Sequence, residues 1–242
     1  MQMILSSLKC AWFFGGYDMR HIIKTDPPQE FIEYCETPGV SFDGLSGVAK
    51  DALRKRLLED QGYICCYCGR KIYNDKNTKI EHVKCQKNYK ELSLCFENML
   101  ASCDGGDKDR ENNVKHQLHC DAKKENKDIP ISPLENIDGY LSFFEDGTVK
   151  GRGEIGRELV RILGLDAKFL NTQRKNAIDK YELCFPDDLE SELLLLKQKH
   201  DGCYEEFCFV LEQYVLDLIN ERDEKTTCDN TGKTNRLMAV NY

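Results

Sequence analysis

Long apolar runs are missing from this 242-residue chain. No stretch approaches the roughly 18 apolar residues that a membrane-spanning helix needs, because Lys9, Lys197 and Glu212 interrupt the nearest candidates. A secretory signal is not expected either, since residues 1–18 begin without basic charge and no small-residue cleavage site follows. The sequence therefore predicts a cytoplasmic protein. Residues 1–18 are expected to be disordered or to precede the true start at Met19.

Two further absences narrow the range of functions. The chain has no Gly-x-x-x-x-Gly-Lys-Ser/Thr loop, so we expect no nucleotide cofactor, and any ATP hydrolysis would come from a partner. The 13 cysteines are odd in number and too sparse for a disulfide scaffold, which favours a reducing compartment. Some of these cysteines are instead candidates for metal ligands.

Charge is unevenly distributed along a chain whose net charge is −8. Residues 69–90 contain seven basic residues against two acidic ones, so this segment can face phosphates. Residues 186–224 contain twelve acidic residues against three basic ones, so this segment should avoid nucleic acid. The charge pattern predicts a half that faces nucleic acid, followed by a half suited to contacts with another protein.

Hydrophobic periodicity predicts both strands and helices, and therefore an α+β fold. Strands are expected at residues 19–24 and 79–83, with a small strand pair within 140–150. Helical segments are expected at residues 48–58, 96–102, 121–126, 154–163, 168–181, 189–199 and 204–220.

Four cysteines have the spacing of metal ligands. One C-x-x-C pair presents two thiolates on a tight turn, and two later cysteines can close a tetrahedral zinc site. His116 and His119 are alternative ligands that could replace the last cysteine. The predicted structural zinc ligands are Cys65, Cys68, Cys103 and Cys120.

The residues between and after these cysteines occur in a recognisable order: Ile80-Glu81-His82, then Phe96-Glu97-Asn98-Met99-Leu100, then Cys120-Asp121-Ala122-Lys123-Lys124. This order resembles the HNH endonuclease family. Its zinc-containing members have C-x-x-C, then Asp or Glu before His, then Asn-Leu, then Cys, then Cys-Asn-x-x-Lys. The match spans residues 65–124 and implies a ββα-metal HNH core.

The resemblance also implies hydrolysis of phosphodiester bonds in nucleic acid, with DNA as the expected substrate. It makes His82 the general base that takes a proton from water. Asn98 would orient this base through hydrogen bonds. Lys124 would contact a phosphate, and Lys84 in the basic segment is expected to do the same.

The catalytic metal ligands follow from the same resemblance. Glu81 corresponds to the acidic ligand, and Asp121 stands where the family usually has Asn or His. Two carboxylates favour a hard divalent ion, Mg²⁺ or Mn²⁺. Because Asp121 adds negative charge near the scissile phosphate, we expect cleavage to depend strictly on the metal.

A narrower resemblance covers residues 19–24, 80–82, 98–103, 140–157 and 163–174. These segments resemble the HNH nuclease subunit of Septu-type and retron-associated anti-phage systems. The resemblance implies a defence effector that acts with an ATPase subunit of the ABC or SMC-like type.

The expected organisation has four parts. Residues 1–18 precede an HNH nuclease domain at 19–135 with its zinc knot, a mainly helical partner-docking region follows at 136–225, and residues 226–242 form a disordered tail. Two alternatives stay open for the function. One is a non-catalytic zinc-knot adaptor that binds nucleic acid, and the other is an RNA-cleaving effector that uses the same site.

Overall fold

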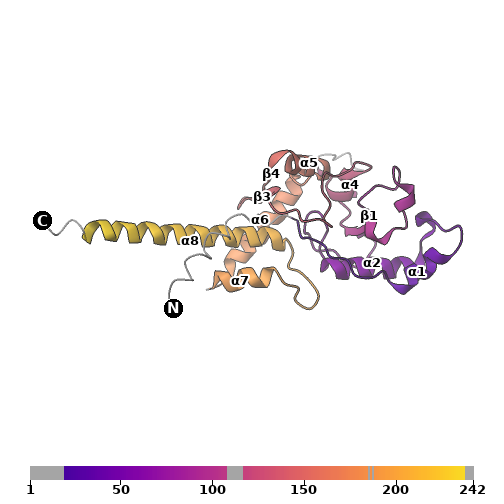
Figure 1. The fold of residues 1–242 in the computed structure, drawn as a ribbon, viewed down its shortest axis with the longest axis horizontal. Coiled ribbons are helices and arrows are strands. Elements are labelled where there is room, and N and C mark those ends of the chain that lie inside the picture. The colour runs from indigo at the N-terminus through magenta and orange to yellow at the C-terminus, as the bar shows by residue number, and fades with distance from the viewer. Residues whose placement is uncertain (1–18, 108–116, 185, 187, 238–242) are drawn as a thin grey trace, which may run out of the picture.

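A computed structural model describes residues 19–107, 117–184, 186 and 188–237, without the side chains of residues 226–237. It combines helices with two small antiparallel sheets in the described part of the chain, which confirms the α+β class. Figure 1 shows α1 and α2 at one end and α8 reaching away from the body at the other. Residues 1–18, with their predicted disorder or late start, lie outside the described residues.

The N-terminal helices are α1 (Gln29–Glu36) and α2 (Gly47–Gln61), with a short 3-10 turn, Phe42–Gly44, between them. Gly62 ends α2 in the left-handed conformation at φ 63°, where glycine carries no steric cost. Helix α2 was predicted, whereas α1 was not. The strand expected at residues 19–24 is wrong, because the structure has no strand there.

The central sheet pairs β1 (Lys79–His82) with β2 (Met99–Ser102) in antiparallel register, with His82 opposite Met99. Two 3-10 turns, Lys90–Leu92 and Phe96–Asn98, lie between the strands. The predicted helix at residues 96–102 is therefore wrong beyond Asn98. All four residues of β2 are buried. A short apolar segment buried on both faces shows no alternation of apolar and polar residues, so its sequence does not distinguish a strand from a helix.

Gln61 protects the outer edge of β2. Its side-chain Nε2 donates to the carbonyl of Ala101 at 2.8 Å, and its Oε1 accepts from the Ala101 amide at 2.6 Å. These two bonds satisfy backbone groups that an edge strand would otherwise leave without partners. Helix α2 is thereby fixed against the sheet that carries Glu81 and His82.

The remaining elements are of the types expected from the sequence, although α8 is longer than predicted. Helix α4 (Cys120–Lys124) precedes a strand pair, and four helices then complete the described chain. The strands are β3 (Leu141–Phe143) and β4 (Val149–Gly151), and the helices are α5 (Gly153–Leu163), α6 (Lys168–Leu183), α7 (Leu189–Leu196) and α8 (Cys208–Leu237).

Residues from both sides of the predicted boundary at 135/136 share one hydrophobic core cluster. Backbone bonds also cross it: the Phe207 amide donates to Gly69 O and the Tyr204 amide to Gly62 O, both at 2.9 Å. The segment just before α8 therefore packs on the end of α2 and on the cysteine turn. The proposed division into a nuclease domain and a docking domain stays a prediction.

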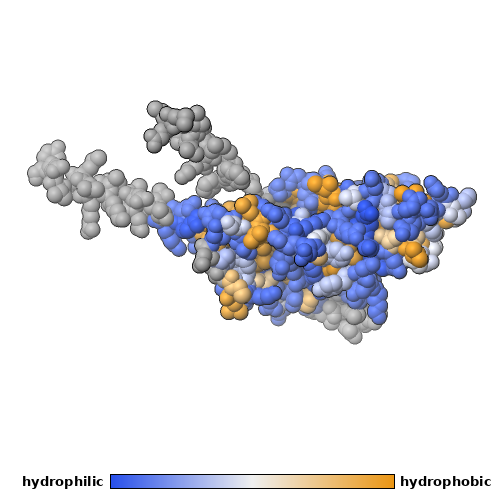
Figure 2. Space-filling view, turned by 90° about the horizontal axis from the view of Figure 1, so that it is seen from below, coloured by the Kyte–Doolittle hydropathy of each residue, from blue (hydrophilic) through white to orange (hydrophobic). Residues whose placement is uncertain are grey.

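Helix α8 continues to Leu237, through residues for which the sequence predicts a disordered tail from 226 onward. Among the described residues, no helix is both long enough and apolar enough to cross a membrane. On the face seen in Figure 2, hydrophobic residues form small separate patches within a mainly hydrophilic surface.

Candidate metal and catalytic site

The four predicted zinc ligands come together in the structure. Their sulfur atoms all lie within 4.8 Å of one another, and all four side chains are buried. Cys65 and Cys68 lie on a turn closed by bonds from the Cys65 amide to Arg70 O and from the Gly69 amide to Cys65 O. Cys103 directly follows β2 and Cys120 begins α4, so the cluster joins the turn, the sheet and the helix.

The spacing of these sulfurs fits zinc. A tetrahedral ion with bonds of about 2.3 Å holds its sulfur ligands about 3.8 Å apart. The Cys65–Cys120 and Cys68–Cys103 sulfurs are 3.8 and 3.9 Å apart. Burial opposes ionisation of Cys65, but hydrogen bonds from neighbouring thiols lower the pKa of this residue well below its usual value. The cluster can therefore bind a metal such as zinc.

Of the two alternative histidine ligands, His119 does not belong to this cluster. His119 is buried next to Cys120, and its Nδ1 donates to the carbonyl of Gln117 at 2.9 Å. Its ring stacks on Phe169 with centroids 5.8 Å apart. His116 lies outside the described residues.

Glu81 and Asp121 form a pair of adjacent carboxyl groups at one end of the sheet. Glu81 is buried on β1, and Asp121 lies in the first turn of α4, close enough to act on the Glu81 carboxyl group. Burial, and then the hydrogen bond and charge of Asp121, raise the pKa of Glu81 to about 8. A divalent cation between the two carboxylates would relieve their repulsion, so the pair fits the expected metal ligands.

Two buried side chains hold the Glu81 carboxyl group in place. The Tyr67 hydroxyl donates to Glu81 Oε1 at 2.9 Å, and the Lys124 ammonium lies 2.8 Å from the same oxygen. Tyr67 belongs to the cysteine turn, so it connects the cysteine cluster to the carboxylate. Only 1% of each of these two residues is exposed.

Lys124 has its partners within the protein, and its phosphate contact stays a prediction. Its ammonium group is buried, pairs with Glu81 and donates to the backbone carbonyl of His82 at 2.9 Å. A buried ammonium must be paired with charge or hydrogen-bond acceptors, and both partners here belong to the site. The sequence shows the charge of Lys124 but not its burial.

His82 follows Glu81 on β1 and has the geometry of a neutral base. Its Nε2 donates to the carbonyl of Ser93 at 2.9 Å, which leaves Nδ1 as the proton-accepting nitrogen. The Phe42 ring packs edge-on against the imidazole, with centroids 4.5 Å apart. Burial lowers the pKa of His82. The hydrogen bond to the Ser93 carbonyl raises this pKa, and the positive charge of Lys124 lowers it further, so the net shift is downward. The imidazole is therefore available to take up a proton near neutral pH.

Asn98 supports the loop after His82 rather than the imidazole itself. Its Nδ2 donates to the carbonyls of Lys84 and Leu92, and its Oδ1 accepts from the Lys84 amide at 2.8 Å. The orienting role of Asn98 stays a prediction. The Lys84 side chain is 45% exposed, and its ammonium lies 3.8 Å from the Asp128 carboxylate. The phosphate contact of Lys84 stays a prediction.

The two carboxylates and His82 line a single cleft of about 470 Å³. Lys124 and Phe42 also reach this cleft. Its lining includes basic side chains from α2, from the turn before β1 and from the start of β1: Lys50, Arg54, Lys76 and Lys79. The structure therefore brings a candidate base, two candidate metal ligands and positive charge to one place.

Comparison with known proteins gives one finding that bears on this site. The chain is similar to a retron nuclease. That relative, from Vibrio cholerae serotype O1 biovar El Tor, is named "Retron Vc95 putative HNH endonuclease". The two chains are 29% identical over 63% of this chain and 79% of the relative. No family model matches the chain. The relative's name supports the HNH resemblance and the nuclease class.

Sequence reasoning missed three contributors to this site. Tyr67 lies inside the Cys65–Cys68 motif, so its position next to metal ligands could have suggested a supporting role. Phe42 carries no motif and reaches His82 only through the fold. The basic residues of α2 were predicted only as part of an amphipathic helix.

Proposed function

We propose that this chain is a metal-dependent HNH endonuclease that hydrolyses phosphodiester bonds in nucleic acid, with DNA as the expected substrate. One observation carries the proposal: Glu81, Asp121 and His82 line one cleft directly beside the cysteine cluster. A zinc-knot adaptor without catalysis would not need a buried carboxyl group and a second, partly exposed one beside a neutral imidazole. In the proposal, β1, β2 and α4 form the ββα-metal core.

The residues of the cleft divide the reaction between them. His82 Nδ1 takes a proton from a water molecule, and the resulting hydroxide attacks phosphorus in line as the bond to the 3′ oxygen breaks. Mg²⁺ or Mn²⁺ held by Glu81 and Asp121 would supply the positive charge that stabilises the pentavalent phosphorane and the leaving oxygen. The Ser93 carbonyl keeps the proton on Nε2 and so keeps Nδ1 free.

The cysteine cluster has a positioning role in this proposal. Structural zinc at Cys65, Cys68, Cys103 and Cys120 would fix the turn that carries Tyr67 and the first turn of α4 that carries Asp121. Both metal-binding carboxylates are therefore aligned by the same clamp. Lys124 supplies the cation that balances Glu81.

We also propose a setting for the enzyme: an effector of anti-phage defence that acts with an ABC or SMC-like ATPase. The name of the Vibrio relative supports a retron context. Residues 186–224, with their strong negative charge, suit a protein partner better than nucleic acid. These residues cover α7 and the first part of α8, which would form the docking surface.

Nicking of supercoiled plasmid by the purified chain tests the proposed activity. We expect nicking with Mg²⁺ or Mn²⁺, none with a chelator, and strong loss in Asp121→Ala. Asp104→Ala, which changes a carboxylate outside the cleft, serves as the matched control. An RNA substrate in a parallel reaction distinguishes the RNA-cleaving alternative. Equal nicking by the Asp121→Ala variant, with or without metal, would contradict the proposed mechanism.

A further inference from the structure

The basic rim of the candidate cleft comes from two separate elements. Lys50 and Arg54 lie one turn apart on α2 and therefore on the same helix face. Lys76 lies in the turn before β1, and Lys79 is the first residue of that strand. All four line the cleft that also contains Glu81, His82 and Asp121. We refer to these four residues as the basic rim.

Much of the positive charge on the basic rim is not neutralised by the protein. The Lys50 and Lys76 side chains form no ion pair or hydrogen bond with another described residue. Arg54 bonds to Asp51 at 3.0 Å through one terminal nitrogen, while its buried Nε has no partner among the described residues. Lys79 lies 3.2 Å from Asp107 in a pair whose side chains are 37% and 41% exposed, and such pairs are weak.

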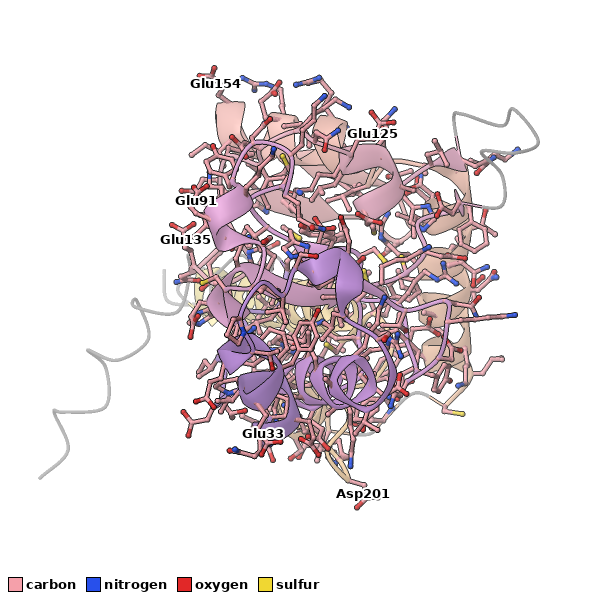
Figure 3. The ribbon with its side chains drawn as sticks, turned by 90° about the vertical axis from the view of Figure 1, so that its right-hand side faces the viewer. Glu33, Glu91, Glu125, Glu135, Glu154 and Asp201 are labelled. Atoms are coloured by element: carbon pink, nitrogen blue, oxygen red, sulfur yellow. The ribbon has the colours of Figure 1, made fainter. Side chains whose placement is uncertain are left out.

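Few carboxylates lie among the residues that line the cleft. In Figure 3, Glu33 and Glu91 lie at the outer edge of the molecule. Glu125 is the one carboxylate of the cleft lining besides the two proposed metal ligands. The cleft thus presents a cationic rim around a floor of two carboxylates, which is the charge pattern that a phosphodiester strand complements.

We propose that Lys50, Arg54, Lys76 and Lys79 bind the backbone phosphates that flank the bond to be cut. This inference rests on the proposed nuclease function and extends it by assigning α2 as one wall of the substrate path. Contacts with phosphates bind DNA and RNA alike and carry no base specificity. Because each contact releases counterions, the basic rim should set the salt dependence of binding.

Binding of labelled single-stranded DNA, duplex DNA and RNA of the same sequence tests the inference by fluorescence anisotropy over a salt series. The full chain carries His82→Ala in every arm, so that no substrate is cut. Each lost phosphate contact reduces the slope of log affinity against log salt by about 0.9 for duplex DNA and about 0.7 for single strands. Lys50→Gln with Arg54→Gln should therefore lower the slope by about 1.8 or 1.4, respectively.

A matched control lies on the same helix. Lys55→Gln with Arg56→Gln removes the same charge from residues outside the cleft lining and should leave the slope unchanged. Since Arg54 is largely buried, Lys50→Gln with Lys76→Gln is a second test on more exposed side chains. Melting curves of all variants show whether each protein is folded.

The outcomes separate this inference from the proposed function. A lower slope in both rim variants, with the control unchanged, supports the inference, and the substrate on which it occurs identifies the polymer. Equal slopes in all proteins would overturn the inference that the basic rim binds phosphates. The nuclease proposal would still stand in that case if the unmodified chain cuts its substrate. Absence of binding by the parent protein at low salt, together with absence of cleavage, would overturn both.

Discussion

The hydrogen bond from Tyr67 to Glu81 makes a specific prediction about metal affinity. Tyr67→Phe removes a single buried hydroxyl group and keeps the ring that packs in the core. Loss of a partner that orients a metal ligand costs roughly 10–100-fold in metal affinity. Lys124 still holds the same Glu81 oxygen at 2.8 Å, so we expect the lower end, about a tenfold increase in half-saturating Mg²⁺ concentration.

The assay is the cleavage rate as a function of Mg²⁺ concentration, with zinc content measured in parallel. The maximal rate at saturating metal should change little, because the hydroxyl acts through Glu81 and not on substrate. Tyr89→Phe is the matched control, since its hydroxyl donates to exposed Asp128 outside the cleft lining. An unchanged metal requirement in Tyr67→Phe, with normal zinc content, would refute the proposed positioning role.

Three further predictions concern stability and metal content. Cys103→Ser should lose zinc and lower the melting temperature by at least about 10 °C, since each kcal/mol of lost stability lowers it by about 2–4 °C. Cys95→Ser, outside the cluster, should change neither the zinc content nor the melting temperature. Arg20→Met leaves buried Glu212 unpaired and should cost about 3 kcal/mol in chemical denaturation, against about 0–1 kcal/mol for Arg222→Met at the surface. Brief EDTA treatment should remove the catalytic metal and abolish cleavage reversibly. The melting curve should not change, because the zinc ligands are buried and the chelator does not reach the zinc in a short time. Irreversible unfolding would contradict the presence of separate catalytic and structural metals.

Local patterns in the sequence predicted much of the fold. The C-x-x-C turn, β1, α2 and the β3–β4 pair are defined by nearby residues, through ligand spacing, alternation or helical period. The cysteine cluster was predictable because zinc geometry restricts which thiols can meet. The predicted strand at residues 19–24 failed because alternation alone does not supply a pairing partner: Lys24 instead donates its ammonium to the carbonyl of Met99 at 2.6 Å.

The finer features of the site depend on contacts between distant segments. Phe42 meets His82, Gln61 meets Ala101, and the Lys124 ammonium is directed inward toward Glu81. The sequence shows which side chains can carry charge or donate a hydrogen bond, but burial decides their partners. For this reason the sequence shows the charge of Lys124, while the structure shows that this charge is buried and paired with Glu81.

Single-turnover cleavage by His82→Ala tests the central claim most directly. Loss of a general base lowers the rate by about 10²–10⁴-fold. We predict this loss at saturating Mg²⁺, with zinc content and melting temperature retained, and no loss in His200→Ala at a surface position. Cleavage by His82→Ala at the rate of the unmodified chain would contradict the assignment of His82 and the catalytic site built around it.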